Sequence, residues 1–245
     1  MPTKDRAICL WTTDYSETSQ VLTMLTRTEG VVRLIAKGAK RSKSKSGGRI
    51  DLFSEGELVF GGGKKEALGT LFEFVEDTNH AAVRRGLDRL NVALYVLELN
   101  SALLAEGDPH PEVFDLTHSV LVRLGQPDAS PPAVLAWFQY RLLKRVGLLA
   151  EVGACAACGG AVGGGAAFSS QAGGLLCRDC QAGATEKIAA SPTAVAGLAA
   201  LAAAEKGKRP ALPEPQARAA NALLAYHIEY QLGKRLKTAR HALGR

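Results

Sequence analysis

Four of the five cysteines stand in two close pairs whose spacing suits metal chemistry. Cys155 and Cys158 form one CxxC pair, and Cys177 and Cys180 form a second pair eighteen residues further on. Each pair can place two thiolates in one tight turn, and two such pairs complete a tetrahedron that suits Zn²⁺. The glycines between the pairs are typical of a ribbon hairpin. The sequence therefore predicts one structural zinc ion bound by these four cysteines.

Other interpretations of the cysteine pairs stay open. A thiol-exchange site is less favoured, because two pairs at this spacing are redundant for redox chemistry. A catalytic zinc needs an open coordination position, and four thiolates leave none. A vestigial site is the remaining alternative. Cys9 stands alone in a predicted strand, where a small buried side chain is the simplest expectation.

A run of cations follows another predicted strand. Its six basic residues fall within thirteen positions, with only Gly, Ala and Ser between them: Lys37, Lys40, Arg41, Lys43, Lys45 and Arg49. Each can neutralise a phosphate and release a counterion, which gives salt-sensitive and sequence-independent affinity for nucleic acid. We predict that this exposed loop binds DNA; the alternative is a solvated loop without a partner.

Two further basic groups are weaker candidates for contacting DNA. One is Arg84 with Arg85, and the other is Lys234 with Arg235, within a predicted final helix. Such residues also form the ordinary solvated face of a helix. A few aromatic residues lie in or beside predicted strands, and the sequence does not say which of them face outward to stack on bases: Trp11, Tyr15, Phe53, Phe60, Phe72 and Phe74.

No constellation typical of an enzyme is visible. The chain lacks a GxxxxGK[ST] phosphate loop, a dinucleotide fingerprint and an HExxH motif. Its five histidines are scattered, and Asp14 with Glu17 lacks the partner cluster of a two-metal nuclease. We predict no catalytic residues and no enzymatic activity.

Charge is segregated along the chain. The formal net charge of +6 divides into +6 over residues 1–50, −8 over residues 51–115 and +8 over residues 116–245. Such segregation is more frequent in proteins with two kinds of partner than in compact enzymes. No segment approaches the roughly 18 apolar residues of a membrane span, and no signal peptide is visible. We expect a cytoplasmic protein without a membrane partner.

The elements that must position these residues follow from the periodicity of the sequence. Five short β-rich runs, at residues 6–13, 20–27, 31–37, 57–60 and 68–76, favour a five-stranded OB-fold barrel over residues 1–79. From residue 79 the spacing becomes helical, with helices expected at residues 81–106, 111–124, 133–146, 192–204 and 216–241. We therefore expect an α+β multidomain protein, in which a helical bundle (residues 80–150 and 186–245) carries an inserted four-cysteine zinc module (residues 151–185).

The N-terminal residues also carry a family pattern. The stretch Ser16-Glu17-Thr18-Ser19 leading into residues 21–26, and the stretch from Gly30 to Arg41, resemble the early signature of the RecO family of recombination mediators. The leucine-rich helices and the two cysteine pairs then follow in the family's order. The resemblance covers essentially the whole chain.

This resemblance implies an OB-fold, a helical domain and a zinc module. It also implies binding of single- and double-stranded DNA, annealing of complementary strands, and action with RecR to help RecA displace single-strand binding protein, whose tail is acidic and hydrophobic. A location at the nucleoid would follow. Because some family members lack the cysteines, the metal is expected to serve structure. The alternative functions are a zinc-braced interaction scaffold whose barrel binds an acidic peptide, and a metal-dependent nuclease.

Overall fold

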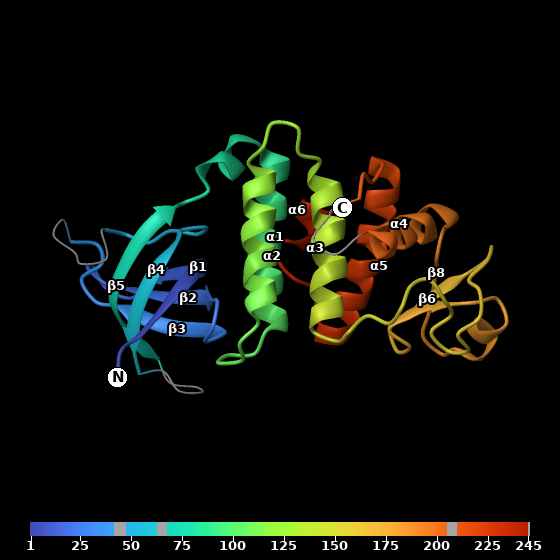
Figure 1. The fold of residues 1–245 in the computed structure, drawn as a ribbon, viewed down its shortest axis with the longest axis horizontal. Coiled ribbons are helices and arrows are strands. Elements are labelled where there is room, and N and C mark those ends of the chain that lie inside the picture. Colours follow the sequence, from blue (N-terminus) through green and yellow to red (C-terminus); the bar gives the residue numbers. More distant parts are fainter. Residues whose placement is uncertain (42–47, 63–67, 205–209, 245) are drawn as a thin grey trace. The chain divides into compact units, whose positions relative to one another are not determined.

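The computed structural model describes residues 1–41, 48–62, 68–204 and 210–244. The chain divides into two compact units, Met1–Pro127 and Asp128–Arg245. The first unit holds a barrel and two long helices, and the second holds three long helices and a small sheet (Figure 1).

The first unit begins with a closed barrel of five strands. The order of the strands around the barrel is β1 (Thr3–Asp14), β2 (Gln20–Thr26), β3 (Val31–Ala36), β5 (Gly69–Thr78) and β4 (Glu55–Gly61). The β3–β5 pair is parallel, and every other neighbouring pair is antiparallel. A closed five-stranded barrel followed by helices confirms the predicted fold class.

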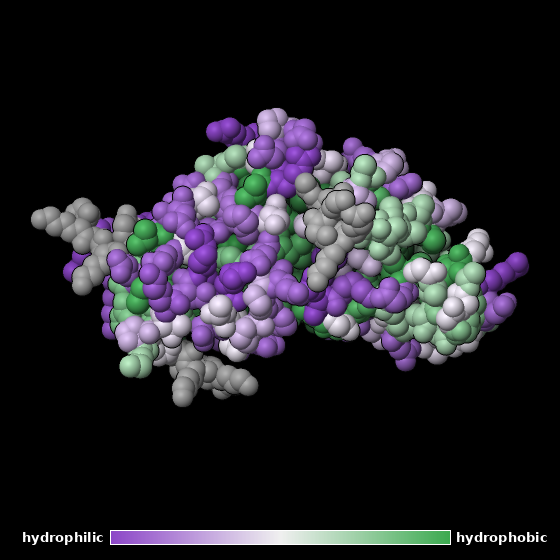
Figure 2. Space-filling model, viewed as in Figure 1, coloured by the Kyte–Doolittle hydropathy of each residue, from purple (hydrophilic) through white to green (hydrophobic). Residues whose placement is uncertain are grey.

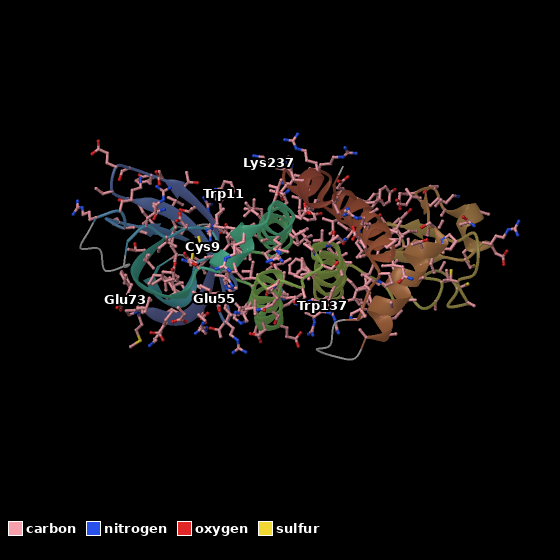
Figure 3. The ribbon with its side chains drawn as sticks, turned by 90° about the horizontal axis from the view of Figure 1, so that it is seen from above. Cys9, Trp11, Glu55, Glu73, Trp137 and Lys237 are labelled. Carbon is pink, nitrogen blue, oxygen red and sulfur yellow. The ribbon has the colours of Figure 1, made fainter. Side chains whose placement is uncertain are left out.

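Alternating side chains fill the barrel, and its interior is apolar. Cys9, Leu22, Met24 and Leu34 are among the fully buried residues of this core. Burial raises the pKa of Cys9 to about 12, which confirms the expectation of a small buried side chain. Trp11 lies only two residues further along β1 and faces solvent (Figure 3).

One buried amide connects the start of β2 to the segment that follows the basic loop. The Gln20 side chain donates to the Ile50 carbonyl over 3.1 Å and accepts from the Ile50 N–H over 3.0 Å. Its amide also donates to Thr12 Oγ1 on β1 over 2.9 Å. Because a buried amide without partners is costly, these bonds fix where the chain re-enters the barrel.

The helical segment after the barrel is broken, whereas one helix over residues 81–106 was expected. A 3₁₀ helix, η1 (Ala81–Arg85), precedes α1 (Leu87–Leu103), and Gly86 separates them with an extended backbone. The prediction of one continuous helix is therefore wrong at its first turn. Asn79 accepts a hydrogen bond from the N–H of Ala81 over 3.1 Å, which favours a local turn over a long helix. The next helix, α2 (Pro111–Leu124), begins and ends where the sequence predicts.

In the second unit, helix α5 packs against both of its long neighbours. The three helices are α3 (Pro131–Arg145), α4 (Pro192–Ala203) and α5 (Glu214–Leu232). Ser191 caps α4, because its hydroxyl accepts from the N–H of Ala194 over 3.1 Å. A three-stranded sheet of order β7-β6-β8 is formed by β6 (Ala167–Ser169), β7 (Gly174–Leu176) and β8 (Ile188–Ala189).

The last long helix is shorter than predicted. Helix α5 ends at Leu232, where Gly233 takes a left-handed φ of 64°, and a short α6 (Ala239–Ala242) follows. Glycine adopts this conformation without steric cost, which makes it a common end of helices. The prediction of a continuous helix over residues 216–241 is therefore wrong. Lys234 and Arg235 lie in the segment after α5, not on one face of a long helix.

The hydropathy of the surface differs between segments. In Figure 2, pale colours, which mark residues of intermediate hydropathy, are frequent over the β6–β8 segment, whose sequence is rich in glycine and alanine. Within the described ranges, no helix combines the length and the apolar character needed to cross a membrane.

Gly56 tests how closely β4 and β5 must approach. A Cβ at Gly56 would lie 2.0 Å from the Val75 carbonyl oxygen, so a methyl group requires the barrel wall to move. We expect Gly56→Ala to lower the free energy of unfolding by about 2 kcal/mol or more, measured by urea denaturation. Gly86→Ala is the matched control, since its Cβ meets only the Arg89 side chain, at 3.7 Å. Equal losses in the two variants would contradict this account.

Candidate metal centre and candidate nucleic-acid interface

The two cysteine pairs come together in the second unit. Their four Sγ atoms lie within 4.8 Å of one another, close enough to hold one metal ion: Cys155, Cys158, Cys177 and Cys180. The β6–β7 hairpin between the pairs returns the second pair to the first, and the N–H of Cys177 donates to Cys155 Sγ over 3.4 Å. Gly159 closes the first turn with a φ of 72°, and its N–H bonds to the Cys155 carbonyl over 2.8 Å.

The electrostatics of this cluster favour a cation. Burial works to raise the pKa of Cys155, but backbone N–H groups, that of Cys177 first, outweigh it and lower the pKa to about 6. Hydrogen bonds with the three other thiols raise the pKa of Cys180 to about 12. Four thiolates at this spacing repel one another, and a divalent ion removes that conflict. The donor set therefore suits a thiophilic metal ion.

A partly buried carboxylate fastens the cysteine-bearing segment to α5. Glu186 accepts hydrogen bonds from the Tyr226 hydroxyl, from the N–H of Gln171 over 3.0 Å and from Ser169 Oγ over 3.2 Å. Burial works to raise the pKa of Glu186, but these bonds, that of Tyr226 first, lower it below its usual range. The same contact raises the pKa of Tyr226 to about 12. An ionised Glu186 thus joins the hairpin to the helix.

On the barrel, two of the described cations of the basic loop contact Asp14, the last residue of β1. Lys40 Nζ lies 2.8 Å from Asp14 Oδ2, and Arg49 Nη2 lies 3.4 Å from Asp14 Oδ1. The hydrogen bond from Lys40 lowers the pKa of Asp14 below its usual range. One carboxylate therefore contacts cations on both sides of residues 42–47. Lys43 and Lys45 fall within that stretch and lie outside the described residues.

Two aromatic residues of the same stretch are exposed. Trp11 is 59% exposed and Tyr15 is 68% exposed, and Trp11 Nε1 donates to Thr13 Oγ1 over 3.0 Å. Lys37 and Arg41 are also exposed. We use the name β1-end surface for these two aromatic residues together with the described cations of the basic loop: Trp11, Tyr15, Lys37, Lys40, Arg41 and Arg49.

The remaining aromatic candidates are core residues or cover the barrel wall. Phe53, Phe60 and Phe74 are buried. Phe72 is half-exposed, but its ring lies over Gly61, where a Cβ would come within 2.6 Å of it. Sequence reasoning could not make this distinction, because irregularities in the pairing of β4 with β5, at Glu55/Gly56 and Val59/Phe60, change which side chains face outward.

The weaker basic candidates occupy different settings. Arg84 donates to the Leu52 carbonyl over 2.8 Å, and its guanidinium lies 5.1 Å from the centre of the Phe53 ring, so it has a structural role. Arg85 is exposed. In the second unit, Lys234 is exposed, and Arg235 Nε lies 3.3 Å from Glu229 Oε2.

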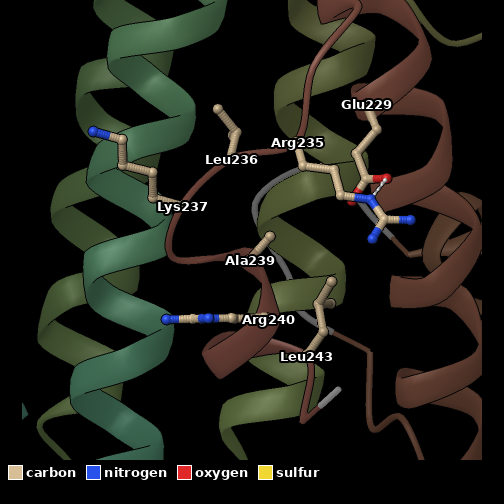
Figure 4. A pocket seen from close by; sticks show the side chains of 7 residues that line it. All are labelled: Glu229, Arg235, Leu236, Lys237, Ala239, Arg240 and Leu243. Carbon is tan, nitrogen blue, oxygen red and sulfur yellow. Dashed lines mark ion pairs between the residues drawn. The ribbon is translucent and has the colours of Figure 1, made fainter.

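The turn after Gly233 creates a groove that the sequence did not reveal. The groove has a volume of about 600 Å³, and Arg235 points across it to Glu229 (Figure 4). It combines basic and apolar side chains: Arg235, Lys237, Arg240, Leu236, Ala239 and Leu243. A continuous helix would not form this groove, so the only sequence signal for it was the glycine at position 233.

The barrel, the helices and the four-cysteine cluster place the protein in the class of OB-fold proteins that carry a helical region and a cysteine cluster able to hold a metal ion. The family models for Recombination protein O match residues 1–76 (N terminal) and 84–240 (C terminal). DNA repair protein RecO of Myxococcus xanthus is 34% identical over 239 residues, which cover 96% of this chain and 94% of that protein. DNA repair protein RecO of Rubrobacter xylanophilus is 32% identical over 229 residues, 91% of each chain.

The chain therefore belongs to the RecO family, as the sequence predicted. Membership supports a role in DNA repair and recombination.

Glu186 provides a test of how the cysteine-bearing segment is fastened. We expect Glu186→Gln to lower the free energy of unfolding by about 1 kcal/mol. This is less than the loss expected for a fully buried hydrogen bond to a charged group, because the site is partly exposed to solvent. Because folding lowers the pKa of Glu186, its contribution is present above the ordinary pKa of 4.5 and is lost as the pH falls below it. The difference from wild type, measured by urea denaturation, should therefore shrink in acid. Glu151→Gln, at a side chain that is 78% exposed, is the control. A loss in Glu186→Gln that does not exceed the control, or does not change with pH, would refute this role.

Proposed function

We propose that this protein is a non-enzymatic recombination mediator. It binds single- and double-stranded DNA without sequence specificity, anneals complementary strands and, with RecR, helps to load RecA on DNA covered by single-strand binding protein. The observation that carries this proposal is the β1-end surface, where loop cations contact the end of β1 and two aromatic residues of the same stretch are exposed, on an OB-fold barrel of the RecO family.

The binding is electrostatic, with stacking as a second contribution. Lys40 and Arg49 offer their charges to phosphates, which compete with Asp14 for them. Trp11 and Tyr15 present ring faces to solvent, and a stacked base contributes about 1–3 kcal/mol whatever its identity. A cationic surface that holds two backbones screens their repulsion, so complementary strands can pair on it.

The groove after Gly233 is our candidate site for the tail of single-strand binding protein. Arg235, Lys237 and Arg240 supply positive charge, and Leu236 and Leu243 supply apolar contacts. A peptide that is both acidic and hydrophobic complements this combination.

We propose Zn²⁺ as the ion of the four-cysteine cluster, with a structural role. Four thiolates leave no open position for a reacting water. The surrounding segment is rich in glycine and alanine and holds few large apolar side chains, so its own core contributes little stability.

Removal of cations from the basic loop tests the DNA site. We expect the combined Lys40→Ala, Arg41→Ala, Lys43→Ala and Lys45→Ala variant to bind a short single-stranded oligonucleotide more weakly. Affinity should also depend less steeply on salt. The magnitude of the slope of log affinity against log salt should decrease by as much as about 3, because each of the four cations that contacts a phosphate on a single strand contributes about 0.7. Fluorescence anisotropy at several salt concentrations measures both quantities, and an unchanged slope would show that the loop is not the DNA site.

Two single variants sharpen this experiment. Asp14→Asn should raise the affinity, because it removes the carboxylate that competes for Lys40 and Arg49. Lys4→Ala removes an exposed cation that pairs with Glu57 elsewhere on the barrel, and should leave the salt slope close to that of wild type. Binding of an acidic peptide in place of DNA in the same assay would favour the scaffold alternative.

Metal removal tests the four-cysteine cluster. The purified protein should contain one thiolate-bound zinc ion per chain, measured by metal analysis with a thiol-reactive chelator. Cys158→Ser should lose this ion and lower the thermal midpoint, while Cys9→Ser leaves the zinc content unchanged because Cys9 is buried in the barrel of the other unit. Retention of the full zinc content in Cys158→Ser would refute the assignment.

A further inference from the structure

A buried carboxylate at the first residue of β4 gathers two histidines that are remote from it in the sequence. The Glu55 side chain is 2% exposed. His80 Nε2 and His118 Nδ1 each lie 2.8 Å from Glu55 Oε2. His80 precedes η1 and His118 lies on α2, so three separate elements of the first unit meet at this point. The histidines that look scattered in the sequence are therefore partly clustered in the fold.

The geometry of this cluster suits a metal ion. One ligand atom from each of the three residues lies within 4.8 Å of the other two. Two imidazole nitrogens and one carboxylate oxygen form a donor set typical of divalent transition metals. With metal–ligand bonds of about 2.0–2.2 Å, only small shifts of the side chains are needed to surround an ion. The His118 side chain is 44% exposed, which leaves a route from solvent to the site.

The backbone around the cluster is held in an unusual conformation. Within the ranges that the structure describes, Phe53 and His80 are the two non-glycine residues with a positive φ, of 71° and 46°. Both adjoin Glu55 along the chain or in space. Such a conformation is strained for a residue other than glycine and persists only where its surroundings enforce it. Arg84 holds both segments, since it stacks on Phe53 and donates to a carbonyl oxygen of each.

Glu55 also faces one permanent cation, Arg6, through its second carboxylate oxygen. Arg6 is shared, because its Nη2 lies 3.2 Å from Glu55 Oε1 and 2.9 Å from Asp77 Oδ2. Arg6 can therefore stay paired with Asp77 when another cation approaches Glu55.

We propose that Glu55, His80 and His118 form a second metal site, which binds one divalent transition ion such as Zn²⁺ apart from the four-cysteine cluster. The ion connects β4, the residue before η1 and α2. A bidentate ion pair already links Arg27, after β2, to Asp115 on α2, with both N–O distances at 3.0 Å. The ion therefore strengthens an existing connection between the barrel and α2. This inference does not depend on the proposed DNA binding.

Cobalt titration tests the proposal on the full-length protein loaded with a single equivalent of Zn²⁺, which occupies the four-cysteine cluster and leaves the second site empty. Co²⁺ bound by nitrogen and oxygen gives weak visible bands, whereas thiolate-bound Co²⁺ adds an intense charge-transfer band, so the two sites are distinguished in one spectrum. We expect one equivalent of Co²⁺ without the thiolate band, together with a higher thermal midpoint. A protein that binds Co²⁺ only with the thiolate band would overturn the proposal.

Variants assign the ligands. His118→Ala should weaken this Co²⁺ binding by at least about tenfold, because even outer-shell partners of a metal contribute about 10–100-fold. Glu55→Gln should do the same while keeping the shape of the side chain. His110→Ala is the matched control, since His110 lies at the start of α2 and pairs with a single carboxylate, Asp108. Circular dichroism verifies folding, and folded His118→Ala with wild-type Co²⁺ affinity would refute the site.

Discussion

The arrangement of the first unit depends on the neutralisation of one buried carboxylate. A charge buried as deeply as that of Glu55 is costly unless partners surround it. Those partners come from β1, from the residue before η1 and from α2, so the contacts that neutralise the charge also fix the helix on the barrel. Loss of any one partner would leave an uncompensated charge, which makes the three contacts act together.

In the second unit, polar contacts likewise stabilise a segment with a small apolar core, the β6–β8 sheet. The β6–β8 sheet consists of strands of two or three residues, too short to be stable by themselves. Polar contacts instead hold this sheet in place. The thiol cluster joins the two ends of the hairpin, and Glu186 joins the hairpin to Tyr226. In both units, therefore, a few charged groups determine how small elements attach to the larger ones.

The sequence predicted what depends on local patterns. Short runs rich in Val, Ile, Leu, Thr and aromatic residues, separated by glycine turns, located all five barrel strands, and the CxxC spacing located the thiol cluster. The helix breaks at Gly86 and Gly233 were missed, because apolar residues stay four positions apart across them: Val83 and Leu87 across the first, Leu232 and Leu236 across the second. The Glu55 cluster was invisible, since its members come from three elements and meet only when the barrel closes. Domain boundaries after residues 79, 150 and 185 stay a prediction.

Asp14 should shorten the time for which a polyanion stays bound to this part of the barrel. Its carboxylate is already in contact with Lys40 and Arg49, so each arriving phosphate exchanges one anion for another and gains only the difference. Short ligands with few contacts then dissociate quickly, whereas a long strand is retained through many weak contacts at once. For the DNA binding proposed above, retention would therefore depend on the number of contacts along the strand more than on the strength of each one, and a strand would be released one contact at a time.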